Sequence, residues 1–552
     1  MHNNEPTNAE IRSSKVILIS PKPKSMWNNG IRQNMLPSYQ RSIQCVGTLL
    51  VMLSLGACGG LPKVGERPSS TAMKNNGGTA LAAAVRPRVA AHQGQSGLHT
   101  LLDGREALAA RLALADAAQR SLDVQYFIWN KDMSGKVLLE HLFRAADRGV
   151  RVRLLLDDLG VMPSDATLLT IDSHPNIEVR MFNPVALRSP RLLGMVADFG
   201  RINKRMHNKS FTADGQASIV GGRNIGDEYF EAHAEMNFAD LDVVLIGPVV
   251  KEVSDEFDLY WNNKSSIPIA ALARQNTTPE QFAAQRAALI AYHETAKDSA
   301  YAQSLRDSEF ARQIRNRSVP YYWGKATIVE DHPDKVATSA DKTETHLAPQ
   351  LRKVVDQTKR ELFLVSPYFV PGKKGVELLA GVRQRGVRVV VITNSLASTD
   401  GVPVHSKYQL YRKALIEAGV ELYEIKPTAG AQLKRRFREP AGSSIGGLHA
   451  KTFTFDRRIG FIGSYNLDPR SSKLNTEMGV FFDCPALARR LPETTERDLS
   501  RNAYRVELDG NRLIWVTREG DKEVRYHSEP DTDLMKRIKA QVISWLPIEW
   551  LL

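Results

Sequence analysis

The pattern of apolar and polar positions along the chain predicts helices that alternate with buried strands. Apolar residues recur at helical spacing after residue 103, and residues 121–129 then alternate as a strand. A second helix is predicted over about 135–148, and it leads into the run 149–156, whose sequence GVRVRLLL suits a strand buried on both faces. Strand, helix and strand in this order predict a parallel sheet.

The same order of elements returns in the second part of the chain. The pattern predicts a helix over 351–359, a strand over 361–369, a helix over 375–384 and a strand over 386–391. Gly-Val-Arg-Val opens the buried strand in both parts, and Tyr-Phe lies within the strand before it. We interpret these repeats as two homologous halves of an α/β protein.

The repeats and the composition of the intervening stretches define the expected domains. A chain of 552 residues exceeds the roughly 250–300 residues that one hydrophobic core supports. Residues rich in Gly, Pro, Ser and Ala follow Cys58 without periodicity, which is typical of a tether. We expect a signal region over 1–57, a flexible tether over 58–95, a first half over 96–267, a helical insertion and linker over 268–345, and a second half with a C-terminal segment over 346–552.

Charge and composition narrow the class of protein. With 42% hydrophobic and 24% charged residues, the chain is neither wholly disordered nor a multi-span membrane protein. Lys and Arg number 74 against 61 Asp and Glu, a net charge of +13. Because residues 1–57 contribute +4 of this, the remainder keeps +9, and a polyanionic partner or substrate is favoured over a basic surface kept for solubility.

A short apolar run near the N-terminus predicts export. Cys45 and Cys58 flank residues 46–57, a stretch too short to span a bilayer but suited to the core of a signal peptide. Its end, Leu-Gly-Ala-Cys at 55–58, resembles the lipobox of bacterial lipoproteins. In a lipobox the cysteine is diacylated and becomes the new N-terminus after cleavage of the signal peptide. The resemblance implies lipidation at Cys58, and it would leave Cys484 as the one other cysteine, so no internal disulfide is expected. The alternative is an apolar segment with a chance cysteine.

This reading implies a membrane-anchored lipoprotein that faces the periplasm. The residue after Cys58 is Gly59 rather than an aspartate, which favours the outer membrane over the inner one. More than forty residues precede the apolar run, so translation from Met35 is an alternative start. If the signal is not used, the protein is expected at the cytoplasmic face of a membrane.

Candidate chemistry lies at matched positions of the two halves. Both halves contain the pattern HxKxxxxD, as HNKSFTAD at 207–214 and as HAKTFTFD at 449–456. Thirteen histidines should yield about 0.03 such matches by chance at average Lys and Asp frequencies. The motif residues are His207, Lys209 and Asp214 in the first half and His449, Lys451 and Asp456 in the second.

Two further residues trail each motif. Asn224 closes the sequence Gly-Gly-Arg-Asn and Asn466 closes Gly-Ser-Tyr-Asn, and Asp240 and Glu477 each lie eight residues before a proline. His and Lys at i and i+2 point to one face of a strand. Facing halves would therefore gather two imidazoles and two ammonium groups around one pocket, which suits a phosphodiester.

This constellation resembles the phospholipase D superfamily over nearly the whole chain after residue 95. The resemblance implies two phospholipase D-like halves, each a mixed or parallel sheet flanked by helices, with one active site at their pseudo-two-fold interface. It implies that His207 is the nucleophile and His449 the general acid and base, roles that sequence symmetry alone leaves open. The lysines, Asn224 and Asn466 are expected to hold phosphate oxygens. Asp240 and Glu477 are expected to orient the histidines.

Other residues are expected to play structural parts. Asp214 and Asp456, although counted in the catalytic motif, follow the strand and are expected to be structural. No convincing cluster of metal ligands is encoded, and no metal or cofactor is expected. His405 is a further candidate to line the pocket, because it follows a buried strand where α/β sheets place ligand loops. Its alternative is an ordinary core histidine.

The resemblance narrows to bacterial cardiolipin synthases, in particular their C-type branch. It is carried by SPYFVP at 366–371, GSYNLDPRS at 463–471, LNTEMG at 474–479 and WLPIEWLL at 545–552. It implies phosphatidyl transfer from one phospholipid to phosphatidylglycerol, with a membrane of phosphatidylglycerol and phosphatidylethanolamine as partner. A monomer is expected, since one chain holds both halves as an intramolecular pseudo-dimer.

Three alternatives stay open at this point. The same site could hydrolyse phospholipids, and a secreted nuclease would share the motif and suit the positive charge. Small nucleases of the superfamily usually carry one motif and dimerise, so the duplicated chain argues against nucleic acid. A non-catalytic lipoprotein that binds phosphorylated ligands is least favoured. The segment 533–552 is either an interfacial helix or a terminus docked on the second half.

Overall fold

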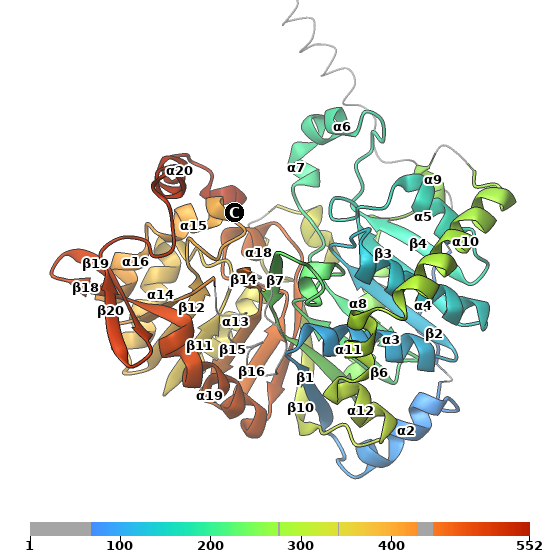
Figure 1. Cartoon of the computed structure of the whole chain (residues 1–552), viewed down its shortest axis with the longest axis horizontal. Coiled ribbons are helices and arrows are strands. Elements are labelled where there is room, and N and C mark those ends of the chain that lie inside the picture. Colours follow the sequence, from blue (N-terminus) through green and yellow to red (C-terminus); the bar gives the residue numbers. More distant parts are fainter. Residues whose placement is uncertain (1–67, 75, 274–275, 340–341, 428–444) are drawn as a thin grey trace, which may run out of the picture. The chain divides into compact units, whose positions relative to one another are not determined.

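The computed structural model describes residues 68–552, except 75, 274–275, 340–341 and 428–444 (Figure 1). The predicted signal region 1–57 and Cys58 lie outside the described residues. Of the helices in the described part, none is both long and apolar enough to cross a bilayer.

The first half is built on a mixed sheet whose centre is parallel. Strands β2, β3 and β4 are parallel neighbours, and β5, β6 and β8 continue the sheet antiparallel from β2. The strands are β1 (Ser96–Leu101), β2 (Ser121–Tyr126), β3 (Arg151–Asp157), β4 (Ile177–Phe182), β5 (Ser210–Ala213), β6 (Ala217–Gly221), β8 (Asp242–Ile246) and β9 (Ser266–Pro268).

The second half repeats this strand order. Strands β11, β12 and β13 are parallel, and β15, β16 and β17 follow antiparallel from β11. The strands are β11 (Glu361–Val365), β12 (Arg388–Asn394), β13 (Glu421–Ile425), β15 (Lys451–Phe455), β16 (Ile459–Gly463), β17 (Met478–Asp483), β18 (Ala503–Asp509), β19 (Arg512–Glu519) and β20 (Lys522–Tyr526). The prediction of two homologous α/β halves is confirmed.

One strand joins the two sheets. The start of β10 (Tyr322–Glu330) pairs with β1, and the rest of it pairs with β17, both antiparallel. The result is a continuous sheet of 18 strands among the described residues. A separate parallel pair, β7 (Met236–Ala239) and β14 (Ile445–Leu448), also crosses between the halves. We expected no strand in 268–345, because the mixed polar and apolar sequence of β10 carries no clear alternation.

Helices cover the sheets and connect their parallel strands (Figure 1). In the first half and the insertion they are α2 (Ala80–Ala90), α3 (Gly104–Ala117), α4 (Met133–Asp147), α5 (Asp165–Asp172), α6 (Arg191–Ala197), α7 (Phe199–Ile202), α8 (Val249–Trp261), α9 (Ile269–Leu272), α10 (Pro279–Ala296), α11 (Ala300–Arg306) and α12 (Glu309–Arg315). In the second half they are α13 (Leu347–Gln357), α14 (Gly372–Gln384), α15 (Val402–Tyr408), α16 (Arg412–Glu417), α18 (Pro469–Lys473), α19 (Pro485–Asn502) and α20 (Leu534–Ser544). Short 3-10 turns are η1 (Asp227–Tyr229), η2 (Pro333–Val336) and η3 (Glu549–Leu551).

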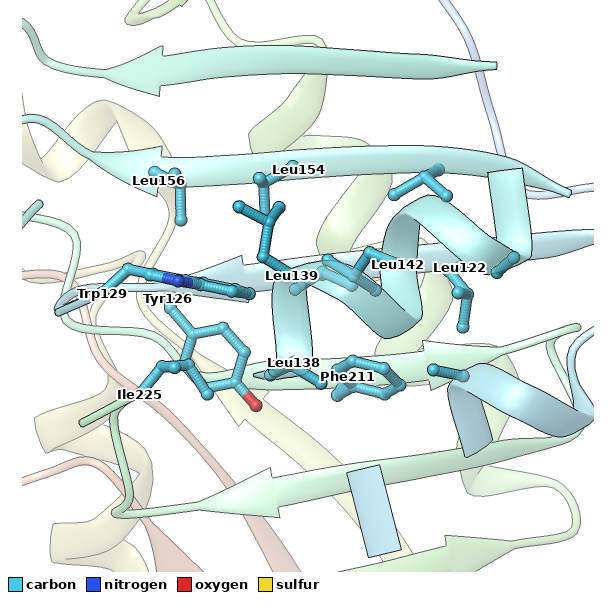
Figure 2. Close-up of a cluster of buried hydrophobic side chains, with 14 of the residues drawn as sticks. Leu122, Tyr126, Trp129, Leu138, Leu139, Leu142, Leu154, Leu156, Phe211 and Ile225 are labelled. Carbon is cyan, nitrogen blue, oxygen red and sulfur yellow. The ribbon is translucent and has the colours of Figure 1, made fainter. Parts of the chain in front are cut away.

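Helix α4 illustrates how the sequence sets the packing. Asp132 caps its first turn by accepting a hydrogen bond from the Gly135 amide. Leu138 and Leu142, four residues apart, then lie on one face and are completely buried. Figure 2 shows these leucines against side chains of β2, β3 and β5, in the main apolar cluster of the first half. The parallel strands are thus covered as the apolar spacing predicted.

The tether that we expected over 58–95 is in fact attached to the first half from residue 68 onward. Arg180 donates to the carbonyl of Pro68, and Arg153 donates to that of Ser70 at 2.9 Å. Both arginines are buried, so these carbonyls help to satisfy their buried donors. Residues 80–90 form α2, capped by Thr79. Composition alone did not reveal these tertiary hydrogen bonds.

The stretch 331–345, at the end of the region that we expected to be a helical insertion and linker, contains a buried ion pair. Asp331 and Lys335 are both buried, and their Oδ2 and Nζ atoms lie 2.9 Å apart. Asp331 also accepts hydrogen bonds from the amides of Leu347 and Glu477, each at 2.9 Å. The segment therefore fixes the backbone beside Glu477 and does not simply connect the halves.

We predict that Asp331→Ala destabilises the protein by about 3 kcal/mol, because it leaves a buried ammonium group and two amides without their acceptor. A lower midpoint in urea-induced unfolding measures the effect. The control is Asp334→Ala, whose carboxylate is 40% exposed and should cost less than about 1 kcal/mol. Equal midpoints for the two variants would contradict the structural part assigned to Asp331.

Candidate active site

The two motif histidines lie where segments of opposite halves meet. Lys209 is the residue before β5, and His207 lies two residues before Lys209. Lys451 is the first residue of β15, and His449 lies two residues before it. The amide of His207 donates to the carbonyl of Thr476, and the amide of His449 donates to that of Ala239, both at 2.8 Å. Each histidine is thus fixed to the residue that precedes the acid of the other half.

The side chains repeat this crossed arrangement. His207 Nδ1 lies 2.8 Å from Glu477 Oε2, and His449 Nδ1 lies 2.6 Å from Asp240 Oδ2. The side chains of both acids are fully buried, and His207 and His449 are 8% and 6% exposed. The sequence predicted an acid for each histidine, but not that each acid comes from the other half. Neither half alone contains a complete histidine and carboxylate pair.

Further side chains hold the two acids in place. Ser464 donates to Glu477 Oε2, and Ser471 donates to Oε1 at 2.8 Å. Asp240 Oδ1 accepts from the Leu241 amide at 2.7 Å. A Cβ at Gly222 would lie 2.3 Å from this same carboxylate, so only glycine leaves room for it. Sequence reasoning missed the two serines as supports, although both lie in the stretch 463–471 that carried the family resemblance.

The motif lysines are buried against the same histidines. Lys209 Nζ donates to the carbonyl of His207 at 2.6 Å. Lys451 Nζ lies 3.0 and 3.1 Å from the two ring nitrogens of His449. Burial lowers the pKa of Lys209 to about 7 and that of Lys451 to about 8, against the opposing influence of the nearby carboxylates. An anionic ligand would restore full charge to both ammonium groups.

The histidines and acids differ in their electrostatic surroundings. Burial, followed by the two lysines, lowers the pKa of His207 well below its usual value, so its imidazole is neutral. Burial raises the pKa of Glu477 to about 7. Burial also acts to raise the pKa of Asp240, but His449 and Lys451 outweigh it and lower that pKa. Burial and Lys451 lower the pKa of His449 as well, and the Asp240 carboxylate is the group that opposes them by stabilising a protonated imidazole.

Comparison with known proteins assigns this arrangement to a family. The family model described as "Cardiolipin synthase, PLD-like domain" matches the chain twice, over residues 112–261 and 351–499. Cardiolipin synthase C of Escherichia coli (strain K12) is 43% identical over 474 residues, which cover 86% of this chain and 99% of that protein. The chain belongs to the phospholipase D-like cardiolipin synthase family. It is an enzyme of the phospholipase D superfamily.

More distant relatives agree with this assignment. The major cardiolipin synthase ClsA of Bacillus subtilis (strain 168) is 25% identical over 75% of this chain and 72% of its own. A solved structure, the phosphatidylserine synthase of Haemophilus influenzae, covers 82% of this chain and 95% of its own with a TM-score of 0.53 at 15% identity. That likeness concerns the fold alone.

The two asparagines of this cardiolipin synthase family member differ in their contacts. Asn224 accepts from the Ile128 amide at 3.2 Å and donates to the Tyr229 hydroxyl at 3.0 Å, so the scaffold fixes its orientation. Asn466 is also buried, and its Oδ1 has no hydrogen-bond partner within the described part of the chain. Their expected contact with phosphate oxygens stays a prediction.

The last residue of each motif caps backbone amides away from the histidines. Asp214 accepts from the amides of Gln119, Arg120 and Ser121, and it occupies the turn after β5 with φ of 52°. Asp456 does the same for residues 359–361, with φ of 55°. Aspartate tolerates this left-handed conformation better than most residues. Although both aspartates were counted in the catalytic motif, their geometry is structural, as their position after the strand indicated.

His405, a further candidate to line the pocket, belongs to a separate buried ion cluster. Its Nε2 lies 2.6 Å from an Arg412 nitrogen and 3.7 Å from Glu529 Oε1. Arg412 also pairs with Glu424 at 2.8 Å. Because these partners occupy its imidazole, the geometry favours the alternative of an ordinary core histidine. Among the described residues, no group of three or more His, Cys, Asp or Glu side chains could hold a metal ion.

We predict that kcat/KM for a soluble phosphodiester falls as the pH rises through about 7–8. The ammonium forms bind the phosphate, and they are lost as the pH passes the lowered pKa values of Lys209 and Lys451. An ordinary lysine, with a pKa of 10.5, would place this limb far higher. Rates with bis(para-nitrophenyl) phosphate measure the profile, and Lys251→Gln, an exposed lysine, is the control. A profile that stays flat to about pH 10 would contradict the assignment.

Proposed function

We propose that the protein is a cardiolipin synthase, a phosphatidyltransferase that moves a phosphatidyl group from one phospholipid to a head-group hydroxyl of phosphatidylglycerol. The observation that carries the proposal is the pair of crossed histidine and carboxylate contacts in a chain 43% identical to cardiolipin synthase C of Escherichia coli over 99% of that protein. Both motifs and both acids lie in one chain, which supports a monomer as the active unit. Phosphatidylglycerol and phosphatidylethanolamine are the candidate donors.

In the first step, His207 Nε2 attacks the phosphorus atom of the donor lipid. Its Nδ1 hydrogen is directed to Glu477, which leaves the Nε2 lone pair free for this attack. The bond from phosphorus to the head-group oxygen breaks, and protonated His449 gives its proton to that oxygen. Lys209 and Lys451 stabilise the charge that develops on the non-bridging oxygens.

In the second step, the acceptor hydroxyl resolves the phosphohistidine. Neutral His449 takes the hydroxyl proton, the oxygen attacks phosphorus, and the bond from phosphorus to His207 Nε2 breaks. His207 is regenerated neutral and His449 protonated, so the cycle closes without a cofactor. The lowered pKa of His207 suits a nucleophile, and the Asp240 carboxylate beside His449 suits a residue that alternates between charge states.

Burial of the reacting groups supports transfer over hydrolysis. Water and an alcohol can both attack the phosphohistidine, so the outcome depends on which one occupies the site at the second step. Both histidines are almost fully buried, which limits the access of water. A membrane also presents phosphatidylglycerol at high effective concentration.

We predict that vesicles of phosphatidylethanolamine and phosphatidylglycerol yield cardiolipin, with release of ethanolamine or glycerol. His207→Ala should reduce the rate by about 10⁴-fold or more and abolish covalent labelling of the enzyme, because no nucleophile remains. His449→Ala should still accept label from a donor with a good leaving group. Mass spectrometry of lipids and of enzyme denatured at alkaline pH, where a phosphohistidine is stable, measures both results.

Other products would assign a different reaction. Phosphatidic acid as the sole product would identify a phospholipase D-type hydrolase. Inactivity on vesicles with degradation of single-stranded DNA would identify a nuclease. Label on His449 that persists in His207→Ala would reverse the two roles.

We also propose that Cys58 carries the lipid anchor and that the mature protein faces the periplasm, in the outer membrane rather than the inner one. The apolar run 46–57, the sequence Leu-Gly-Ala-Cys and the following Gly59 support this. Mass spectrometry of the purified N-terminus should find a diacylated cysteine at residue 58, and Cys58→Ser should remove it. A chain that keeps residues 1–57 without modification would contradict the proposal.

A further inference from the structure

The exposed apolar side chains of the protein are concentrated in two short segments. Twelve of the seventeen large apolar side chains that are exposed in the described residues lie within 187–199 or 534–550. Single exposed apolar residues are ordinary on a protein surface, whereas such concentration marks an interaction site. The twelve are Leu187, Leu192, Leu193, Val196, Phe199, Leu534, Met535, Ile538, Val542, Trp545, Leu546 and Trp550.

Helix α20 turns its large apolar side chains away from the protein. Its buried residues are the small Ala540 and Ser544, four residues apart. Leu534, Ile538 and Val542 follow the same spacing on the opposite face, and all three are exposed. Trp545, directly after the helix, is 73% exposed. A helix that only completes the fold would bury its large side chains and expose its small ones.

The α6–α7 segment is attached at the end of the first sheet where His207 lies. Arg188, just before α6, bonds to Asp158 at 2.7 Å, and Asp158 directly follows β3. The neighbouring parallel strand β2 leads at the same end into Phe127, whose ring lies 5.1 Å from that of His207. Leu192 of α6, 70% exposed, therefore projects from the catalytic end of this sheet.

Helix α20 has the equivalent attachment in the second half. Lys407 of α15 donates to the carbonyl of Ser544 at 2.7 Å, and Lys536 of α20 donates to that of Ala397 at 3.2 Å. Ala397 lies three residues beyond β12, whose last residue, Asn394, bonds both backbone groups of Leu448 beside His449. Both apolar segments are thus attached near the carboxyl ends of parallel strands, at the ends of the two sheets where the catalytic histidines lie.

Arg470 links the residues that follow the two segments. Its guanidinium donates to the carbonyl of Asn203, after α7, at 3.0 Å and to the carbonyl of Leu551, in η3, at 2.8 Å. Trp550 of η3 is exposed next to this contact. In Figure 1, α6, α7 and α20 lie along the same upper edge of the molecule. The two segments, from distant parts of the sequence, therefore present their apolar side chains on the same side of the molecule, and we name them together the docking surface (187–199 and 534–550).

The charge beside the docking surface selects its partner. Residues 534–550 contain three basic side chains, Lys536, Arg537 and Lys539, against one acidic side chain, Glu549. Large apolar residues, tryptophans and a basic flank are the features of helices that lie in the interface of an anionic bilayer. A second protein would require a shaped apolar pocket for its side chains, whereas a bilayer accepts separate projecting side chains.

We propose that the docking surface inserts into the head-group region of an anionic phospholipid bilayer and holds the two catalytic histidines over it. This inference rests on the proposed function, since it supplies lipid substrates to the same site. It assigns to α6–α7 and α20 a binding role that is independent of any lipid at Cys58.

Binding to vesicles tests the docking surface without catalysis. The full chain with Cys58→Ser removes the predicted acyl anchor, and flotation with phosphatidylglycerol vesicles measures its affinity. Leu192→Ser with Val196→Ser, and Met535→Ser with Trp545→Ser, should each weaken binding about tenfold, because apolar groups no longer enter the bilayer. The matched control is Leu102→Ser with Ile290→Ser, two exposed apolar residues outside the docking surface. Docking variants that bind like this control would overturn the proposal.

Turnover separates this inference from the proposed function. The rate on vesicles, divided by the rate on a soluble phosphodiester, should fall about tenfold in the docking variants and stay constant in the control. If the docking variants lose vesicle binding but the parent makes no cardiolipin, the docking surface is supported and the proposed function is contradicted. If the parent makes cardiolipin and the docking variants make it at the same rate, the proposed function is supported and the docking surface is contradicted. Variants that change the oligomeric state and not vesicle binding would assign the surface to a second copy and overturn the proposal.

Discussion

The active site depends on two hydrogen bonds that cross between the halves of the chain. His207 relies on Glu477 and His449 relies on Asp240, so each imidazole is oriented by a carboxylate from the other half. A histidine without this contact would rotate and change tautomer, and neither the nucleophile nor the acid would be defined. Strand β10, which joins the sheets, and the β7–β14 pair beside the histidines hold the halves together in the arrangement that these hydrogen bonds need.

Burying two lysines and two histidines together costs desolvation free energy, and this cost is tied to phosphate binding. The lysines lie at lowered pKa values of about 7 and 8, which keeps the empty site from holding its full positive charge. A phosphodiester supplies the missing negative charge, so the site is stabilised by its own substrate. The difference between the two acids then separates the roles of two histidines that occupy equivalent positions in the repeat.

Much of this arrangement follows from the sequence, because the signals are local and repeated. Apolar spacing predicted the parallel strands, and the duplicated motif predicted which side chains converge. Contacts between distant segments were not predictable in this way. The pairing of His207 with Glu477 rather than with an acid of its own half depends on how the sheets meet, and so do the strand β10 and the ion pair of Asp331. Composition likewise predicted a flexible tether where residues from 68 onward are attached to the first half by hydrogen bonds from buried arginines.

A crystal structure with orthovanadate, which mimics the transferring phosphoryl group, would show whether the two halves form a single site. We expect one vanadate for each chain, bonded to Nε2 of His207, with Nε2 of His449 on the opposite side of the vanadium and both motif lysines on its equatorial oxygens. Two vanadates, each bound within a single half by its own histidine and lysine, would contradict the claim that the halves form one site.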